Sequence, residues 1–400
     1  MSAFYLYDDA RARQFEPFAM TRPLGELRIG ARLMRERWEL ALGVRCAGFV
    51  SRDTLADFEE AGAPDAARGV IPAGAWLVNA RFAPALTRAA SADRYRGGDA
   101  VAAVRLTRDV PVEELADGSA TLESLARATG GATPLDGWWL AEVWDLLADF
   151  EARLRDDVER LTAGRERTVA ANCQVLGGAG VFAAPDAVIE PYVTFDCTNG
   201  PVMIEAGATV QSFTRIQGPT WIGPHAVVGG DKITVCAIGD ACKVHGEMNS
   251  VVFVAYANKA HDGFLGHSYL GRWVNLGANT VTSNLKNTYG PVALWTPSGI
   301  RDTGLQFLGT LFGDHAKTGI GLTLTTGTVI GAGAQLYGSQ MPPKVVSPFA
   351  WGDTAPYATF RLDKFLLVAE RVMARRHVSL SDRGRRFLSR VFDARWSAER

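Results

Sequence analysis

The sequence predicts two folds in one chain of 400 residues: an N-terminal α/β domain and a C-terminal parallel β-helix made of hexapeptide turns. Two ladders of mostly aliphatic residues, each with a spacing of six, indicate the second fold. They are Ile204, Val210, Ile216, Ile222 and Val228, and Phe312, Thr318, Leu324, Ile330 and Leu336. A period of six fits neither an amphipathic helix nor a half-buried strand, because side chains there repeat every ~3.6 and ~2 residues. The first part of the chain lacks this period and alternates short apolar runs with helical patterns, which favours an α/β fold.

Each hexapeptide is expected to supply one short strand and one corner of a prism, with its aliphatic side chain pointing inward. Glycine often follows the aliphatic residue, as in the pair Ile222-Gly223. A side chain at that position would crowd the backbone of the corner, so these glycines support the same fold. The β-helix should begin near Asn172 and end near Val346.

Two stretches, 249–266 and 285–305, break the hexapeptide rhythm. Solenoid coils accept insertions as loops at their corners, and such loops often have functional roles. We therefore expect functional loops at both stretches. The predicted organisation is an α/β domain at 1–165, a β-helix domain at 166–346 and a helical cap at 347–400.

The N-terminal domain is expected to contain a mainly parallel, Rossmann-like sheet. Apolar runs predict strands at 4–7, 75–78 and 100–106, and a helical pattern covers 27–42. Strands that alternate with helices favour parallel pairing, because a parallel connection needs a crossover. A charged helical pattern at 140–161 predicts an exposed helix that links the two domains.

The C-terminal segment leaves the β-helix after Pro342-Pro343. Helical patterns predict two terminal helices, at 363–375 and 381–396. We expect these helices to cap the end of the stack, which would otherwise be an open sheet edge.

The composition limits the classes of partner. The formal net charge of −1 argues against nucleic acid as the main partner. The N-terminus lacks a basic segment followed by an apolar run, and no stretch of 18 apolar residues would span a bilayer. The five scattered cysteines are typical of free thiols in a reducing compartment. These features predict a cytoplasmic protein with no membrane and no nucleic-acid partner.

Polar residues with chemical potential cluster at 258–263, the sequence Asn-Lys-Ala-His-Asp-Gly. A functional interpretation makes His261 a general base, since a free imidazole is half-neutral near pH ~6.5. The alternative is a solvated loop in which histidine and asparagine cap turn backbone groups. His261 and His267 lack a Cys or a second acidic residue at ligand spacing, so the sequence predicts no metal site here.

The solenoid resembles the acetyltransferase half of the bifunctional enzymes that make UDP-N-acetylglucosamine (GlmU-type). The segments 258–266, 274–280 and 282–284 look like the catalytic segment of that family and the coil after it, and 312–338 is similar to its acetyl-CoA coils. A variant, GlmU-like branch of sugar nucleotidyltransferases is most similar, through segments such as 21–30. The resemblance implies a sugar-1-phosphate nucleotidyltransferase domain joined to a left-handed β-helix.

The resemblance implies roles for individual residues. His261 matches the catalytic base. Substrate-binding positions are Asn249, Lys259, Asn275, Asn284 and Lys286, and cofactor-binding positions are Ala278, Lys317 and Ile320. Phe264 replaces a tyrosine that holds the sugar phosphate, and Asn249 or Ser250 replaces a lysine, so the acceptor sugar remains open.

The N-terminal domain departs further from the family pattern. The family has a glycine-rich loop after its first strand to hold nucleotide phosphates, whereas residues 7–14 contain no glycine. The resemblance places nucleotide contacts at Asp8, Arg13, Arg22 and Asn79. Asn79 replaces an aspartate that binds Mg²⁺, and an amide is a weaker ligand for that ion. The domain is therefore either degenerate or built around a rearranged site, with Mg²⁺ as a possible cofactor.

The resemblance implies an acetyl-CoA-dependent N-acetyltransferase that acts on an amino-sugar 1-phosphate of the glucosamine 1-phosphate type, fused to a UDP-N-acetylglucosamine pyrophosphorylase-like domain. It also implies a homotrimer with CoA between neighbouring prisms. The alternative from another class is a trimeric scaffold that binds nucleotide-sugar through a degenerate domain and catalyses nothing. A third hypothesis, a carbonic-anhydrase-like solenoid, needs three converging histidines that the spacing does not indicate.

Overall fold

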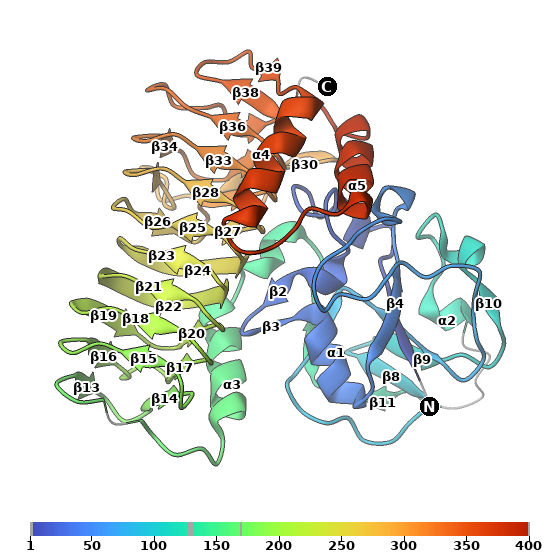
Figure 1. Ribbon diagram of the computed structural model, residues 1–400. Coiled ribbons are helices and arrows are strands. Elements are labelled where there is room, and N and C mark those ends of the chain that lie inside the picture. The colour runs from blue at the N-terminus through green and yellow to red at the C-terminus, as the bar shows by residue number, and fades with distance from the viewer. Residues whose placement is uncertain (1–2, 126–130, 169, 399–400) are drawn as a thin grey trace. The chain divides into compact units, whose positions relative to one another are not determined.

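The computed structural model describes residues 3–125, 131–168 and 170–398 (Figure 1). The chain divides into two compact units. The first comprises 1–145 and 381–394, and the second comprises 146–380 and 395–400.

A six-stranded mixed sheet forms the centre of the first unit, in the order β11-β8-β9-β6-β1-β4. Its strands are β1 (Phe4–Tyr7), β4 (Cys46–Val50), β6 (Trp76–Asn79), β8 (Arg94–Gly97), β9 (Ala100–Arg105) and β11 (Thr133–Pro134). The three strands expected from the apolar runs are confirmed. β1 pairs in parallel with β4 and β6, but β9 is antiparallel to both β6 and β8. Only two residues separate β8 from β9, so these strands form a hairpin. The sheet is mixed: three of its five strand pairings are parallel and two are antiparallel.

Helix α1 (Met34–Leu42) covers part of this sheet and begins later than the helical pattern suggested. Residues 28–33 instead form a small hairpin of β2 (Arg28–Ile29) and β3 (Arg32–Leu33), which turns at Gly30 with a φ of 59°. The indole of Trp38 is fully buried and donates a hydrogen bond of 3.0 Å to the carbonyl oxygen of Phe82. The positive φ of Gly30 explains the late start of the helix.

The remaining elements of the first unit are short, except for the last helix. They are β5 (Val70–Ile71), β7 (Phe82–Pro84), β10 (Val110–Pro111), β12 (Gly137–Trp139), α2 (Leu122–Leu125) and α5 (Asp382–Asp393). In α5, Phe387 packs edge-to-face on Phe58 with 5.6 Å between ring centroids. The C-terminal helix α5 therefore groups with the first unit rather than with the solenoid residues. Within the described residues, no helix is long and apolar enough to cross a membrane.

The second unit is a parallel β-solenoid with three faces. The first face comprises β13 (Gln174–Leu176), β16 (Thr194–Asp196), β19 (Thr214–Gln217), the first halves of β22 (Asp231–Asp240) and β24 (Met248–Ala255), β26 (Leu265–Gly266), β29 (Val281–Thr282) and β34 (Thr323–Leu324). The second comprises β14 (Val181–Ala183), β17 (Val202–Ile204), β20 (Thr220–Ile222), the second halves of β22 and β24, β27 (Tyr269–Leu270), β32 (Thr310–Phe312), β35 (Thr328–Ile330) and β37 (Val345–Val346).

The third face ends at the corner that contains His261. It comprises β15 (Val188–Ile189), β18 (Thr209–Val210), β21 (Val227–Val228), β23 (Lys243–Val244), β25 (Asn258–Lys259), β28 (Asn275–Leu276), β33 (Lys317–Thr318), β36 (Gln335–Leu336) and β38 (Ala350–Gly352), with β39 (Ala358–Thr359) antiparallel at its end. Figure 1 shows these strands stacked along the solenoid.

The aliphatic ladders lie inside the prism, as the period of six predicted. The exposed fractions of Ile204, Ile216, Ile222, Leu324 and Ile330 are between 0% and 2%. Because each strand is only two to four residues long on one face, one inward side chain per strand fills the core. The hexapeptide ladder therefore identified the inward positions correctly.

The rhythm break at 249–266 is a shortened coil rather than an inserted loop. Ile222, Ile238, Phe253 and Leu270 occupy equivalent positions on the second face, at steps of 16, 15 and 17 residues. The expectation of a loop there is wrong, because strands with parallel partners continue through it.

The second break, at 285–305, is a true insertion. It contains an antiparallel hairpin of β30 (Ala293–Thr296) and β31 (Gly299–Asp302). On the second face, β27 of the coil before the insertion pairs directly in parallel with β32, the first strand after it. The extra residues therefore leave the solenoid and return to it without disturbing the stack.

Two helices pack on the sides of the solenoid. Helix α3 (Phe150–Thr162) packs on β17, β20 and β22, and helix α4 (Leu362–Ala374) runs along the stack (Figure 1). Phe365 of α4 packs edge-to-face on Phe349 at 4.9 Å, whereas Arg376, just beyond the helix, donates a hydrogen bond of 2.8 Å to the carbonyl oxygen of Ala241. These contacts are several coils apart, so α4 lies along the side of the stack and does not close its end.

Candidate active site

His261 lies at the corner where the chain leaves the third face and enters the first. Strand β25 ends at Lys259 and β26 begins at Leu265, so the corner spans five residues. Gly263 has a φ of 120°, a conformation that favours glycine. The side chains of His261 and Asp262 are exposed. An exposed imidazole on a corner is accessible to a substrate amine.

Lys259 lies beneath this corner with its side chain in the prism. It pairs with Val244 of the preceding coil and is 0% exposed. Its ammonium donates a hydrogen bond of 3.1 Å to the carbonyl oxygen of His245 and another to the carbonyl oxygen of His261. Burial lowers the pKa of Lys259 to about 8. The resemblance made Lys259 a substrate contact, but in the structure its ammonium holds the backbone of the corner.

A polar ladder covers the outer surface of the third face. The amide nitrogen Nδ2 of Asn258 donates a hydrogen bond of 2.9 Å to Oδ1 of Asn275 in the next coil, and Asn275 pairs in turn with Lys317. All three line one cavity of about 330 Å³ beside α4. The structure thus brings a predicted substrate contact, Asn275, and a predicted cofactor contact, Lys317, into the same cavity.

Ala278 and Ile320 are stacked at the same corner as His261, one and two coils further on. The backbone nitrogen of Gly321 donates a hydrogen bond of 2.7 Å to the carbonyl oxygen of Ala278. A Cβ atom on Gly277 would lie 2.5 Å from the backbone of Gly319, so these coils approach closely. The side chain of Ile320 is 77% exposed. This corner therefore offers a surface that runs from His261 to Ala278 and Ile320, two of the three predicted cofactor positions.

The other predicted substrate residues lie at the far end of the first face. Asn284 Nδ2 lies 2.8 Å from Nδ1 of His267, and Asn249 accepts a hydrogen bond of 2.9 Å from the Ser250 hydroxyl. Lys286 is inside the insertion, where its ammonium donates a hydrogen bond of 2.9 Å to the carbonyl oxygen of Pro291. One strand of the first face separates these positions from the His261 corner in each coil.

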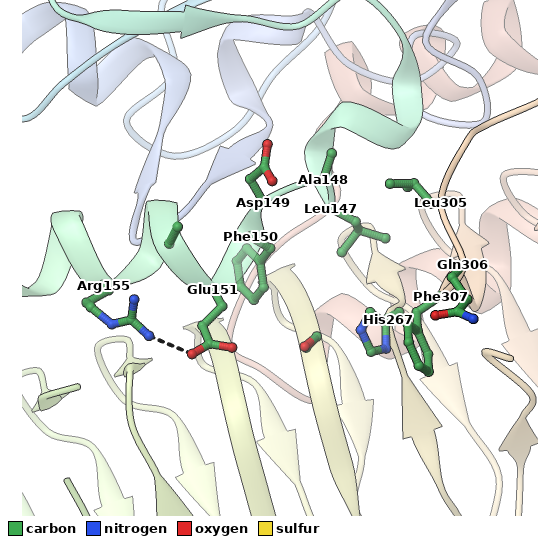
Figure 2. Close-up of a pocket in the computed structure, with 12 residues that line it drawn as sticks. Leu147, Ala148, Asp149, Phe150, Glu151, Arg155, His267, Leu305, Gln306 and Phe307 are labelled. Carbon is green, nitrogen blue, oxygen red and sulfur yellow. Dashed lines mark hydrogen bonds and ion pairs between the residues drawn. The ribbon is translucent and has the colours of Figure 1, made fainter. Parts of the chain in front are cut away.

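His267 lines a second cavity, of about 450 Å³, next to Phe307 (Figure 2). Its ring stacks on Phe307 at 5.1 Å, and burial lowers its pKa to about 4. The start of α3 forms the opposite wall, where Glu151 and Arg155 form an ion pair of 2.6 Å. A neutral imidazole whose Nδ1 faces the Asn284 amide presents Nε2–H as a donor, so His267 is suited to binding rather than to proton abstraction.

The sequence did not predict the residues that form the walls of the cavity beside α4. Tyr256 and Trp273, which stack at 4.3 Å, line the cavity beside α4 together with Arg375 and Arg376 of the C-terminal segment. These residues come from segments that only the folded solenoid brings together. Tyr256 and Trp273 occupy equivalent corners, with positive φ values of 54° and 63°. No repeating pattern in the sequence predicts that these two residues are equivalent.

The four predicted nucleotide contacts of the first unit are engaged within the protein. The Asp8 carboxylate is buried, accepts a hydrogen bond of 2.6 Å from the Ser51 hydroxyl, and burial raises its pKa to about 6. The Arg13 guanidinium donates a hydrogen bond of 3.0 Å to the carbonyl oxygen of Asp8. Arg22 is 1% exposed and forms an ion pair of 2.8 Å with Glu60. Both arginines therefore support the fold directly.

Asn79 lies beside Asp9, a carboxylate that the sequence interpretation overlooked. Asn79 Nδ2 donates a hydrogen bond of 2.9 Å to Asp9, and Arg81 forms an ion pair of 2.7 Å with the same carboxylate. Burial alone would raise the pKa of Asp9, but Arg81 and Asn79 together hold it below its usual value. Asp9 could have been identified from the sequence, because it directly follows Asp8 at the carboxyl end of a parallel strand.

These residues do not fit a Mg²⁺ ion. The Asp9 carboxylate is neutralised by Arg81, and Asn79 contributes an uncharged amide. Among the described residues, no group of three or more His, Cys, Asp or Glu side chains is arranged to hold a metal ion. Hard divalent cations need several free oxygen ligands, which this edge of the sheet does not offer.

Comparisons with known proteins agree with this architecture. Residues 4–166 match the family model described as sugar nucleotidyl transferase. The bifunctional protein GlmU of Synechococcus elongatus is 30% identical over 166 residues, which cover 36% of this chain and 32% of that protein. The bifunctional sugar-1-phosphate nucleotidylyltransferase/acetyltransferase of Sulfurisphaera tokodaii is 30% identical over 143 residues, 35% of this chain and 36% of that protein.

The match is distant and partial. GlmU of Methanococcus vannielii is 26% identical over 202 residues, which cover 50% of this chain and 42% of that protein. The chain thus spans between 32% and 42% of the length of these three relatives. Residues 4–166 therefore match a sugar nucleotidyl transferase domain, and over about a third to a half of its length the chain is a distant homologue of the GlmU-like bifunctional nucleotidyltransferase/acetyltransferases.

Proposed function

We propose that the solenoid transfers an acetyl group from acetyl-CoA to the amine of an amino-sugar 1-phosphate, with His261 as general base. One observation supports this most strongly. The exposed His261 side chain lies on a corner whose backbone is held by the buried ammonium of Lys259, three residues after Asn258 of the polar cavity. A fixed backbone beneath an accessible imidazole favours proton transfer, because catalysis requires a positioned base.

The chemical step of the proposed reaction uses His261 and backbone amides of this corner. The amine attacks the thioester carbonyl, so that the C–N bond forms and a tetrahedral oxyanion results. The oxyanion then collapses, and the C–S bond breaks to release the CoA thiolate. His261 accepts the amine proton and returns it to the CoA thiolate, so the charges balance. Backbone amides near Ala278 stabilise the oxyanion. A positioned general base contributes a rate factor of roughly 10²–10⁴.

The proposal assigns the acceptor to residues around the first and third faces. Asn275 is in the cavity beside α4, whereas Asn249, Asn284 and Lys286 are at the far end of the first face. We propose that Asn249, Asn284 and Lys286 serve a neighbouring subunit's corner in a homotrimer.

Exposed apolar side chains support that assembly. The corner of His261 also carries Tyr192, Phe213 and Ile320, which are 64%, 78% and 77% exposed. Tyr192 and Phe213 stack with 5.8 Å between ring centroids. Large exposed apolar groups along one edge of the solenoid favour contact with another protein surface. Because α4 covers the outer surface of β28 and β33, a neighbour would dock on this corner rather than on the third face.

A second function, binding of a nucleotide-sugar without turnover, is our proposal for the first unit. The paired Asp9 and Arg81 and the amide of Asn79 favour it over pyrophosphorylase activity. Under this proposal the first unit recognises a nucleotide-sugar and the solenoid performs the transfer.

Mass spectrometry of the product tests the main proposal. The protein is incubated with acetyl-CoA and glucosamine 1-phosphate, and N-acetylated product is counted directly. Direct detection avoids thiol reagents, which the half-buried Cys46 and Cys173 would complicate. Product formation above the uncatalysed rate supports acetyl transfer. No product with glucosamine 1-phosphate or other hexosamine phosphates would leave the non-catalytic scaffold as the better account.

A further inference from the structure

The cavity beside α4 lies between the third face of the solenoid and helix α4. Its floor is one outward side chain from each of four successive strands of the third face, namely Lys243, Asn258, Asn275 and Lys317. Its roof is the C-terminal end of α4 and the residues after it, with Val368, Val372, Arg375 and Arg376. A volume of about 330 Å³ suits a small chemical group and not a folded partner.

Four positive charges line this cavity without an acidic partner. They belong to Lys243, Lys317, Arg375 and Arg376. In the part of the chain that the structure describes, none of the four forms an ion pair with a carboxylate. The Lys317 ammonium lies 3.1 Å from the carbonyl oxygen of His315, and the Arg376 guanidinium binds the carbonyl oxygen of Ala241. Both partners are neutral, so the repulsion among the four charges is uncompensated.

The pKa values agree with this geometry. Burial lowers the pKa of Lys317 to about 8 and holds that of Arg376 below its usual value. The stacked rings of Tyr256 and Trp273 form an apolar wall at one side. Low-dielectric walls strengthen the attraction between these cations and any anion that enters.

We propose that this cavity is a binding site for a phosphate ester or pyrophosphate group, held by Lys317 and Arg375. A guanidinium and an ammonium together match phosphate oxygens, which accept several charge-assisted hydrogen bonds. Asn258 and Asn275 supply amide groups on the same floor. The negative charge of the ligand offsets part of the positive charge of the cavity.

This inference rests on the proposed acetyl transfer for the identity of the ligand. Asn258 and Asn275 precede the His261 corner by three residues and the Ala278 position by three residues. A phosphate bound in the cavity thus leaves the rest of its molecule at that corner. The phosphate belongs either to the amino-sugar acceptor or to CoA, and both present the same chemistry.

Isothermal titration calorimetry of the full-length protein with inorganic pyrophosphate tests the site. Lys317→Met keeps the apolar stem and removes the charge, and Arg375→Gln removes the roof charge. Arg371→Gln is the matched control, since Arg371 is on the same helix but does not line the cavity. We expect roughly tenfold weaker binding for each cavity variant, the usual effect of one charge-assisted hydrogen bond, and less than about twofold for the control.

Titrations with glucosamine 1-phosphate and with CoA identify the source. If glucosamine 1-phosphate binds in a Lys317-dependent way, the cavity holds the acceptor. If CoA does so, the cavity holds the donor. No saturable binding of any of the three anions, or equal losses in Lys317→Met and Arg371→Gln, would overturn the site. If the protein transfers acetyl groups but its anion binding does not depend on Lys317, the inferred phosphate site is refuted and the proposed function stands. Lys317-dependent binding in a protein that transfers no acetyl refutes the proposed function alone.

Discussion

The ammonium of Lys259 donates a hydrogen bond to the backbone carbonyl oxygen of His261 from inside the solenoid. The same ammonium also reaches the carbonyl oxygen of His245 in the preceding coil, at 3.1 Å. A lysine at an inward ladder position is costly, because burial disfavours its charge. The structure shows what offsets that cost: two carbonyl groups at neighbouring corners are satisfied by one side chain. The backbone position of the candidate base thus depends on a lysine that is buried inside the prism.

Replacement of Lys259 by methionine separates positioning from stability. Methionine fits the apolar interior but leaves the carbonyl groups of His245 and His261 without the ammonium. The lost hydrogen bonds and the relieved burial of charge oppose each other, so the free energy of unfolding should change by only about 1–2 kcal/mol. The kcat of acetyl transfer should fall by roughly 10- to 100-fold as the corner moves. Urea unfolding and steady-state kinetics measure the two effects, and an unchanged kcat would refute the positioning role.

Replacement of Asn79 by aspartate tests the first unit. The new carboxylate would face Asp9 Oδ2, which Asn79 Nδ2 now binds at 2.9 Å. Two carboxylates compete for Arg81, so we expect lower stability and no gain in nucleotidyl transfer. Pyrophosphate release from UTP and a hexosamine phosphate is the readout, with Asn79→Ala as the uncharged control. A rise in turnover above about tenfold would show that a metal-dependent site needs only this carboxylate.

The sequence predicted the solenoid because its information is local and repeated. Each inward ladder position, such as Ile222, is set by its own hexapeptide and confirmed by the next one. The mixed sheet was not predictable in the same way. The antiparallel strand β9 depends on a two-residue turn at Gly98 and Asp99, a signal weaker than the apolar run beside it.

The candidate site was only partly predictable for a similar reason. The corner of His261 is one continuous segment, so its motif was visible in the chain. The shortened coils around Phe253 and the cavity beside α4 depend on contacts between distant segments. Arg375 directly follows a helix whose sequence shows an amphipathic pattern but not the surface it covers. The residues that form the roof of the cavity therefore could not be predicted from the sequence.

Stabilisation by pyrophosphate should depend on pH through Lys317. Its pKa of about 8 in the folded protein is below the ordinary value of 10.5, so the folded state holds this proton less tightly than the unfolded chain. The uncompensated charge therefore lowers the free energy of unfolding below pH ~8, and the penalty disappears as the pH rises toward ~10.5. An anion compensates the charge, so the gain in Tm should be larger near pH ~7 than near pH ~9.5.

The charged and titratable groups that face Lys317 are Lys243, Tyr256, Arg375 and Arg376. Lys317→Met distinguishes its contribution from theirs, and differential scanning calorimetry with and without pyrophosphate is the measurement. The pH dependence should flatten in that variant. An equally steep dependence in Lys317→Met would assign the effect to another group.

Light scattering tests the proposed homotrimer. The wild-type protein should show three times the mass of the chain at micromolar concentration. Phe213→Asn should weaken the assembly, because it removes an exposed ring from the His261 corner while asparagine accepts the positive φ of 63° there. Leu367→Asn on the exposed side of α4 is a control of similar polarity change. A wild-type monomer would contradict the assembly and any site shared between subunits.

The most direct test of the account is the kcat of acetyl transfer in His261→Asn, measured by mass spectrometry of the N-acetylated sugar phosphate. His225→Asn is the matched control, since His225 is also an exposed corner histidine, and asparagine accepts its φ of 57°. The account predicts a loss of roughly 10²–10⁴-fold in His261→Asn, with unchanged binding of CoA, and a control within about twofold of the wild type. A His261→Asn protein with the kcat of the wild type would contradict it.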